Sequence, residues 1–500
     1  MKGIVSPIIN KYILCISIII CFVQLPATAQ NTFDEYRAQK RAEFDRYRNS
    51  KREAFEAYRA KKNQEFADFL SQKWGNYNLS KGRPQPKQPD PVTPTVAPKQ
   101  ETKPTKPIDL PFGQVLSTPK PVEPKPIDFP VEPEAPKRPK VRITLYGWPC
   151  EVCFTPEMRF TLGSISEKNV GKIWKLLSGD SYTPLLADCH ELHKNLKLGD
   201  FGLLRLAEAV AQQTLGKSNE AVILQTYIMT QFGYDVRLCQ QGNKLGMIVP
   251  FKQIVCNTPY YQIDGVNYYV WDKSMRGGTV SSYKQNMKDA TRKIDLLMTS
   301  SPKFMPHNGS AKTRTIRSTA YPDVCMTAES NKNLIDFYND YPMMQDFGVY
   351  AAQPLNQDII SRSYAQLRES LAGKSKLEAA EILLNLVQTG FKYQTDEEQF
   401  GQEKYNFGEE TLYYPACDCE DRSILFAHLI RDLLGLDIIL LHYPNHLATA
   451  VCFDQIVNGN CLKINGKRYT ICDPTYINAR VGMCMKQFIN TRPTVYRINR

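Results

Sequence analysis

Residues 416–435 read Ala-Cys-Asp-Cys-Glu-Asp-Arg-Ser-Ile-Leu-Phe-Ala-His-Leu-Ile-Arg-Asp-Leu-Leu-Gly. From Ser423 onward the apolar residues recur on one face of a helix, and Gly435 is a typical helix stop. Cys419 is therefore expected at the start of a buried helix. Unpaired backbone N–H groups and the positive end of the helix dipole favour a thiolate there. The stretch predicts a nucleophilic thiol, with N–H groups beside it that could hold an oxyanion.

Two stretches downstream supply a base and a group that can orient it. The chain has six histidines, and His446 opens an apolar run that is typical of a strand following a turn. Asp473 closes the next expected strand, 469–473. If residues 446–453 pair with this strand as an antiparallel hairpin, Asp473 can orient the ring of His446. Cys419, His446 and Asp473 are thus the candidate catalytic residues.

Three motifs around these residues resemble those of a known superfamily. They are Asp418-Cys419-Glu420-Asp421 at a helix start, Asn445-His446-Leu447-Ala448-Thr449-Ala450-Val451, and Cys472-Asp473-Pro474-Thr475. In type and order they are similar to the motifs of the transglutaminase-like cysteine proteases and acyltransferases, over residues 375–480. The resemblance implies an α+β, papain-like core with Cys419 as nucleophile, His446 as general base and acid, and Asp473 as its orienter. Members of that superfamily hydrolyse peptides, cross-link side chains or do neither, so the reaction stays open. Gln388 is a candidate for an oxyanion-stabilising side chain.

Other cysteines and histidines offer alternatives. Cys417 is a rival nucleophile that we interpret as a spectator thiol, and His442 is a rival base. The pair Cys150-Glu151-Val152-Cys153 favours a local disulfide or two buried thiols over a metal site, which needs two more ligands. His190-Glu191-Leu192-His193 is more typical of a solvated helix surface than of zinc. We expect no metal and no cofactor.

An internal similarity appears when the sequence is shifted by 202 residues. Residues 233–238 then align with 435–440, and residues 243–245 with 445–447. The Cys419 position holds Lys217, the His446 position holds Lys244, and one residue later in register Asp272 matches Asp473. This pattern predicts two tandem copies of one fold: a degenerate domain over 141–320 without the thiol chemistry, and a domain over 321–500 that carries it.

The first 140 residues differ from the rest in composition. Residues 1–29 contain a 14-residue apolar run and Ala27-Thr28-Ala29, which is typical of a secretory signal peptide. Residues 30–81 repeat a pair of aromatics every 11 residues, which predicts an amphipathic helix and favours self-association over binding to a membrane surface. Residues 82–140 hold 17 of the 33 prolines and are expected to form an open, Pro-rich linker.

The charge distribution argues against nucleic-acid binding. The formal net charge is +12, but only +3 falls on residues 141–500, whereas a nucleic-acid reader concentrates basic residues on its folded surface. No later segment has the 18 or more apolar residues of a membrane span, so we expect none after signal cleavage. The sequence favours an exported peptidase or amidase, in the periplasm or at the cell surface, acting on a protein or peptide. A non-catalytic envelope or surface binding protein and a cross-linking transglutaminase are the alternatives.

Overall fold

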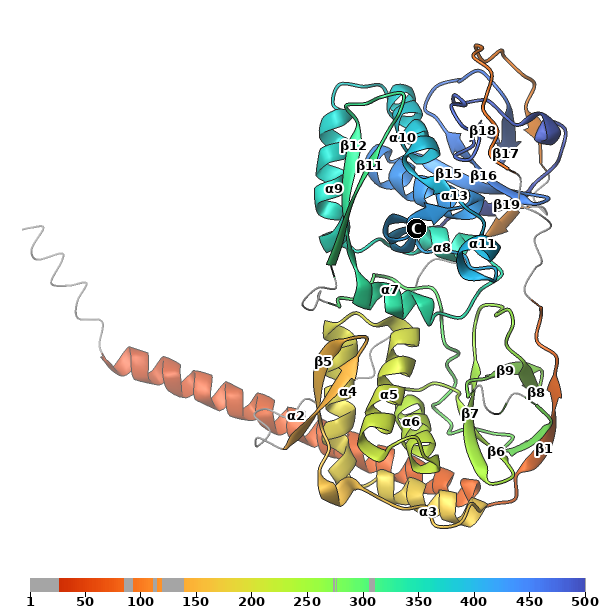
Figure 1. Cartoon of the computed structure of the whole chain (residues 1–500). Coiled ribbons are helices and arrows are strands. Elements are labelled where there is room, and N and C mark those ends of the chain that lie inside the picture. Colours follow the sequence, from red (N-terminus) through yellow and green to blue (C-terminus); the bar gives the residue numbers. More distant parts are fainter. Residues whose placement is uncertain are drawn as a thin grey trace, which may run out of the picture. The chain divides into compact units, whose positions relative to one another are not determined.

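The computed structural model describes residues 27–84, 93–110, 115–118, 139–272, 275, 277–304 and 311–499 (Figure 1). The expected signal peptide therefore lies, up to residue 26, outside the described residues. The chain forms two compact units, Met1–Lys62 and Asn63–Arg500. None of the helices among the described residues is long and apolar enough to cross a membrane.

The N-terminal helix α2 spans Ala27–Leu70, eleven residues short of the end expected at 81. The indole N–H of Trp74 donates to the Leu70 carbonyl at 3.0 Å, and the Ser71 hydroxyl donates to the Ala67 carbonyl at 2.9 Å. These bonds satisfy carbonyls that the end of a helix leaves open. The chain then enters a strand, β1, at Gly75–Ser80.

The second unit is mixed α and β and consists of two lobes (Figure 1). The first lobe, residues 139–304, forms a closed barrel together with β1, and the strand order is β1-β10-β6-β7-β9-β8. Its elements are β4 (Lys140–Leu145), β5 (Trp148–Cys153), α3 (Glu167–Leu177), α4 (Thr183–Asn195), α5 (Gly199–Leu215), α6 (Asn219–Gln231), β6 (Arg237–Gln241), β7 (Lys244–Pro250), β8 (Tyr260–Ile263), β9 (Val266–Val270) and β10 (Thr279–Ser282).

The second lobe, residues 311–499, is built on a seven-stranded sheet with the order β2-β17-β18-β16-β15-β19-β3. Its own elements are β11 (Ala311–Arg317), β12 (Cys325–Asn331), α7 (Lys332–Asn339), α8 (Phe347–Ala352), α9 (Gln357–Ser370), α10 (Lys376–Gly390), β13 (Lys392–Tyr393), α11 (Asp396–Phe400), α12 (Gly408–Tyr413), β14 (Ala416–Cys417), α13 (Cys419–Leu429), β15 (Asp437–Tyr443), β16 (His446–Cys452), β17 (Cys461–Ile464), β18 (Lys467–Cys472) and β19 (Thr494–Arg497).

The central part of each sheet follows the same path. In the first lobe α6 precedes the run β10-β6-β7-β9-β8, and in the second lobe α13 precedes the run β19-β15-β16-β18-β17. The neighbours within both runs are antiparallel. In each lobe the helix packs on the second strand after it, β7 or β16.

The Pro-rich stretch is not an open spacer throughout, which corrects that expectation for its described parts. Two short strands from it, β2 (Ile108–Asp109) and β3 (Val115–Ser117), pair in parallel with β17 and β19. They extend the sheet of the second lobe at both edges. Two or three residues without proline suffice for such pairing, because an edge strand offers unpaired N–H and C=O groups.

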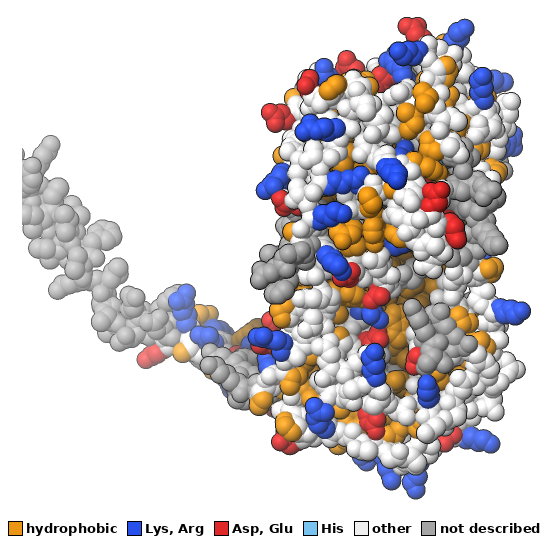
Figure 2. Space-filling view, in the orientation of Figure 1, with side chains coloured by type: hydrophobic (Ala, Val, Ile, Leu, Met, Phe, Trp, Pro, Cys, Tyr) orange, Lys and Arg blue, Asp and Glu red, His pale blue; other side chains and the backbone are white. Residues whose placement is uncertain are grey.

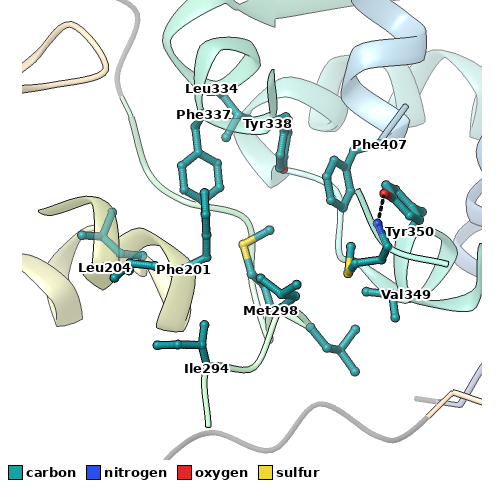
Figure 3. Close-up of a cluster of buried hydrophobic side chains, with 14 of the residues drawn as sticks. Phe201, Leu204, Ile294, Met298, Leu334, Phe337, Tyr338, Val349, Tyr350 and Phe407 are labelled. Carbon is teal, nitrogen blue, oxygen red and sulfur yellow. Dashed lines mark hydrogen bonds between the residues drawn. The ribbon is translucent and has the colours of Figure 1, made fainter. Parts of the chain in front are cut away.

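Aromatic and aliphatic side chains form a continuous core between the lobes (Figure 3). The Phe201 ring from α5 lies 5.5 Å from that of Phe337 in α7 and 4.3 Å from that of Tyr341, measured between centroids. Phe407 in turn stacks on Tyr338 at 4.6 Å. This packing fixes the first lobe against the loop that leads to α12 and α13.

Candidate active site

Cys419 is the first residue of α13, as the sequence predicts, and Asp418 is the N-cap residue. The helix continues through a π-helical turn at Ile430–Leu434 and ends at Gly435, whose φ of 65° favours glycine. The Cys419 side chain is buried, and its Sγ donates to Oε2 of Glu420 at 3.0 Å. The thiol therefore lies at a helix start, in contact with an acidic neighbour.

His446 is the first residue of β16, directly after the turn at Pro444-Asn445. Its Nε2 donates to Oδ2 of Asp473 at 2.9 Å. The imidazole stacks on the ring of Phe488, with the centroids 5.2 Å apart. Within the described residues, Nδ1 is buried and has no hydrogen-bond partner. With the proton on Nε2, Nδ1 presents a lone pair that can accept a proton.

Asp473 follows β18, which pairs antiparallel with β16 and places Cys472 opposite Thr449. Its Oδ1 accepts hydrogen bonds from the backbone N–H groups of Thr475, at 2.9 Å, and Tyr476, at 3.2 Å. The sheet pairing and these two bonds hold the carboxylate toward the imidazole.

Gln388 is not an oxyanion donor in this arrangement, which corrects that assignment. Its Nε2 donates to the backbone carbonyls of Asp473, at 3.0 Å, and Ala479, at 3.1 Å. The amide group is thus used to position the segment that carries Asp473.

The thiol lies against the strand of the candidate base. Ser423, one turn after Cys419 on α13, donates to the carbonyl of Leu447 at 2.8 Å, and a hydrogen bond with the Leu447 backbone also acts on the thiol. Leu447 directly follows His446. His446 is therefore hydrogen-bonded to Asp473, and Cys419 contacts Leu447, the residue after His446 in β16. The hydrogen bond that the thiol donates goes to Glu420 and not to the imidazole.

The electrostatics at Cys419 differ from the expectation of a favoured thiolate. Burial raises the pKa of the Cys419 thiol well above its usual range, and the carboxylates of Glu420 and Asp418 raise it further. The hydrogen bond with the Leu447 backbone acts in the opposite direction. The helix terminus is outweighed because the sulfur is buried and two carboxyl groups flank it, so the resting form is the thiol.

A buried cluster of carboxyl groups adjoins the thiol, and the sequence analysis missed it. Carboxylate oxygens of Asp396, Glu403 and Glu420 lie within 4.8 Å of one another, as do those of Asp396, Asp418 and Asp421. These oxygens could surround a cation. The acidic residues on both sides of Cys419 are the sequence feature that could have indicated the cluster. Asp396 could not be added to it from the sequence, because it is distant from Cys419 along the chain.

Crowding keeps several of these groups protonated. Burial raises the pKa of Asp396 to about 10, with Asp421 and Glu420 raising it further. Burial also raises the pKa of Asp421 to about 7, and that of Asp418 well above its usual range. Like charges in a poorly solvated site disfavour full ionisation.

The alternative residues lie elsewhere or are engaged in packing. Cys417 in β14 is buried, and burial raises the pKa of its thiol to about 12. The His442 ring packs 5.1 Å from that of Phe347, and burial lowers its pKa. The twelve cysteines of the described residues form no disulfide with one another, so the local disulfide considered for Cys150 and Cys153 is not formed. Nε2 of His193 lies 3.2 Å from the Gly199 carbonyl.

The chain matches no protein-family model, no curated protein and no solved structure.

Proposed function

We propose that this protein is an exported, thiol-dependent acyl-transfer enzyme, a peptidase or amidase that acts on protein or peptide amides. Cys419 is its nucleophile, His446 its general base and acid, and Asp473 the residue that orients the imidazole. The observation that carries the proposal is the 2.9 Å hydrogen bond between His446 Nε2 and Asp473, which leaves Nδ1 of a buried histidine open on the strand that contacts the thiol.

The proposed reaction proceeds through a thioester. His446 Nδ1 takes the proton of the Cys419 thiol as the sulfur attacks the carbonyl carbon of the amide. The tetrahedral intermediate collapses when the protonated imidazole gives its proton to the leaving nitrogen, and an amine departs. Water then attacks the thioester, with His446 accepting its proton, and the thiolate leaves as the carboxylic acid forms. Backbone N–H groups at the start of α13 are the candidate oxyanion donors.

The raised pKa of the thiol fits a nucleophile that loses its proton to His446 only as it attacks an electrophile. With Cys419 and His446 both buried, a substrate can reach the sulfur only after a local opening. The Cys419 thiol must turn from Glu420 toward Nδ1 of His446, and general-base catalysis then supplies the thiolate during attack rather than beforehand.

The two-copy architecture belongs to the same proposal. The common strand order of the two lobes supports an origin of residues 141–320 and 321–500 as tandem copies of a papain- or transglutaminase-like core. Lys217 and Lys244 cannot serve as a thiol nucleophile and an imidazole base, so the first copy would act in binding. Export to the periplasm or cell surface rests on the signal-peptide pattern of residues 1–29.

A non-catalytic binding protein is the second candidate, and one observation favours it. The thiol is sealed from solvent and protonated, with its hydrogen bond directed to Glu420 rather than to the imidazole. A structural descendant of an enzyme would retain the His446–Asp473 pair for packing and lose the need for an accessible sulfur.

Alkylation of the mature chain separates these candidates. Iodoacetamide at neutral pH, followed by peptide mapping, should label Cys419 in preference to Cys417, which is equally buried and lies two residues away. His446→Ala should abolish the preference while circular dichroism stays unchanged. Slow, uniform labelling of all cysteines would favour the binding protein.

A glutamine-containing peptide tests the reaction type. Incubated with and without a fluorescent amine, it should give free acid in both cases if water is the acceptor. Incorporation of the fluorescent amine would favour the cross-linking transglutaminase instead. Cys419→Ala is the control for both products, since it removes the sulfur and little volume.

A further inference from the structure

A cavity of about 1310 Å³ lies between the two lobes. Its walls come from α6, β7 and the end of β9 in the first lobe, and from residues 338–343 and 400–407 in the second lobe. Figure 2 shows hydrophobic side chains gathered in the recess between the lobes. We call it the inter-lobe cleft. Small-molecule sites usually enclose about 300–1,000 Å³, so this cleft has room for a larger ligand.

The cleft occupies the place that corresponds to the triad in the second lobe. Lys217, Lys244 and Asp272 all line it. Lys217 lies just before α6, and Cys419 is the first residue of the corresponding helix, α13. Lys244 is the first residue of β7, and His446 is the first residue of the corresponding strand, β16. Thus the first lobe keeps an open cleft at these positions.

Both basic and acidic side chains line the cleft. Lys217 and Lys244 are exposed and, among the described residues, take part in no ion pair. The other cations are neutralised within the protein: Arg205 contacts Asp340 at 2.6 Å, and Lys404 contacts Glu410 at 2.6 Å. Lys217 and Lys244 are therefore the cleft cations that form no ion pair among the described residues, and carboxylates such as Glu220 and Asp272 line the same cleft.

Part of the cleft lining is aromatic. Trp271, Tyr341 and Phe400 line it and are each half-buried. Rings of this kind take up apolar or aromatic side chains of a ligand. Two lysines without an ion pair and several aromatic rings in the lining of one cleft fit a chain molecule in which acidic and apolar groups occur together.

One residue of the cleft lining belongs to the carboxylate cluster beside the thiol. Glu403 lines the cleft and also belongs to the carboxylate cluster with Asp396 and Glu420. Glu420 in turn accepts the hydrogen bond of Cys419. A ligand that reaches Glu403 is therefore separated from the sulfur by the side chain of Glu420.

We propose that the inter-lobe cleft binds an extended polypeptide segment, with acidic side chains over Lys217 and Lys244 and apolar or aromatic side chains over Trp271. This inference rests on the proposed function in one respect only, that the bound segment is the substrate presented to Cys419. The binding itself requires no chemistry.

The test is a binding titration with the mature Cys419→Ala chain, which cannot turn substrate over. The probe is a fluorescein-labelled ten-residue peptide that alternates aspartate with leucine and phenylalanine, and its partner has each aspartate replaced by asparagine. Fluorescence anisotropy should show that the acidic peptide binds about tenfold more tightly. This preference should weaken as salt is raised, because the lysines are exposed.

Two double variants locate the site. Lys217→Met with Lys244→Met should lower the affinity for the acidic peptide about tenfold and remove the preference over the asparagine peptide. Lys172→Met with Lys175→Met is the matched control, since both lysines are exposed on α3 in the same lobe and neither lines the cleft. Equal loss in both variants, or tighter binding of a lysine-containing peptide, overturns the proposal, as does binding of oligosaccharides but not peptides.

The outcome is separable from that of the enzymatic proposal. If Cys419 shows no preferential alkylation but the acidic peptide binds through Lys217 and Lys244, the cleft is a binding site of a non-catalytic protein. If Cys419 is preferentially alkylated and the lysine variants bind the peptide normally, the enzyme stands and the cleft assignment is wrong.

Discussion

The imidazole of His446 and the carboxylate of Asp473 meet at 2.9 Å across the β16–β18 pair. Because Asp473 accepts from Nε2, the other ring nitrogen is left without a proton in the neutral imidazole, and this tautomer alone can receive a proton from a thiol. Asp473 occupies the Nε2 side of the His446 ring. The thiol must therefore approach the Nδ1 side.

Asp473→Asn should therefore slow the reaction of Cys419. The asparagine amide can donate to Nε2, which moves the proton to Nδ1 and blocks proton transfer from the thiol. A comparable exchange of tautomer costs about 10⁴-fold in a serine protease; here we expect alkylation of Cys419 to slow by about tenfold or more. Asp454→Asn, on the surface, is the control. An unchanged rate, with the fold intact, contradicts the assigned role.

The carboxylate cluster gives the stability a defined pH dependence. Raised pKa values for Asp421, about 7, and Asp396, about 10, mean that the folded chain holds protons that the unfolded chain releases near pH 4. Their contribution is full below about pH 4 and is lost as the pH rises through 7 toward 10. Urea unfolding should show a free energy of unfolding that falls over this range.

Asp396→Asn tests that assignment. The amide cannot ionise, so the variant should be more stable than the parent chain at about pH 9 by roughly 1–3 kcal/mol and should show a shallower pH slope. Glu397→Gln is the matched control, because Glu397 is exposed on the same helix, α11. Parallel pH profiles for the parent and Asp396→Asn would show that the carboxyl groups are neutralised in another way.

Phe488 covers the candidate base, and its truncation should open the site. The ring is buried and nearly parallel to the imidazole of His446, at 7°. Phe488→Leu keeps an apolar contact at a cost of about 1–1.5 kcal/mol and should accelerate alkylation of Cys419 several-fold. Phe304→Leu removes a similarly buried ring that packs against Phe337, and it should leave the rate unchanged. Equal acceleration in both variants would indicate general loosening.

Sequence patterns could place the elements around the site because those patterns are local. The start of α13 at Cys419, the strand from His446 and the position of Asp473 after a strand follow from apolar periodicity, turns and hairpin geometry. The carboxylate cluster and the cover by Phe488 could not be found this way, since Asp396 and Phe488 reach the site through tertiary packing. The prediction that the helix start lowers the pKa of the Cys419 thiol was wrong for the same reason. Burial and the carboxyl group of Glu420 raise this pKa by more than the helix terminus lowers it.

The Pro-rich stretch shows the same limit. Its composition describes an open chain, yet the Ala97 N–H donates to the Ile477 carbonyl at 2.8 Å, and the Ile477 N–H donates to the Thr95 carbonyl at 2.9 Å. Ile477 belongs to the segment that follows Asp473. Pairing of so few residues leaves no periodic signal in a sequence.

Ala97→Pro should release this contact, because proline has no N–H to donate. Losing a buried hydrogen bond costs about 1–3 kcal/mol, so the thermal midpoint should fall, and amide exchange should rise at Ile477. Thr95→Pro is the matched control: Thr95 contributes only its carbonyl to this pair, and proline keeps it. If both substitutions have the same effect, rigidity of the strand rather than the Ala97 hydrogen bond is responsible.

The aromatic stripe of α2 should mediate self-association of the chain. In the last of its 11-residue repeats Phe66 is buried, with its ring 5.1 Å from that of Trp174. In the first two repeats the rings of Tyr36, Phe44 and Tyr47 are exposed, at 56%, 61% and 63%. The exposed rings continue the same stripe as the buried Phe66, which favours their burial against a second copy of the helix. The 11-residue period favours a right-handed supercoil between the two helices.

Sedimentation of the mature chain over a range of concentrations measures this association. Replacing Tyr36, Phe44 and Tyr47 by serine should give a monomer at every concentration at which the parent chain is oligomeric, because the association has lost the apolar area that drives it. Asn49→Ser changes the same helix on the side opposite the stripe and should leave the oligomer intact. A parent chain that stays monomeric but binds anionic lipid vesicles through these rings would instead assign the stripe to a membrane surface, as expected for an amphipathic helix with flanking Lys and Arg residues.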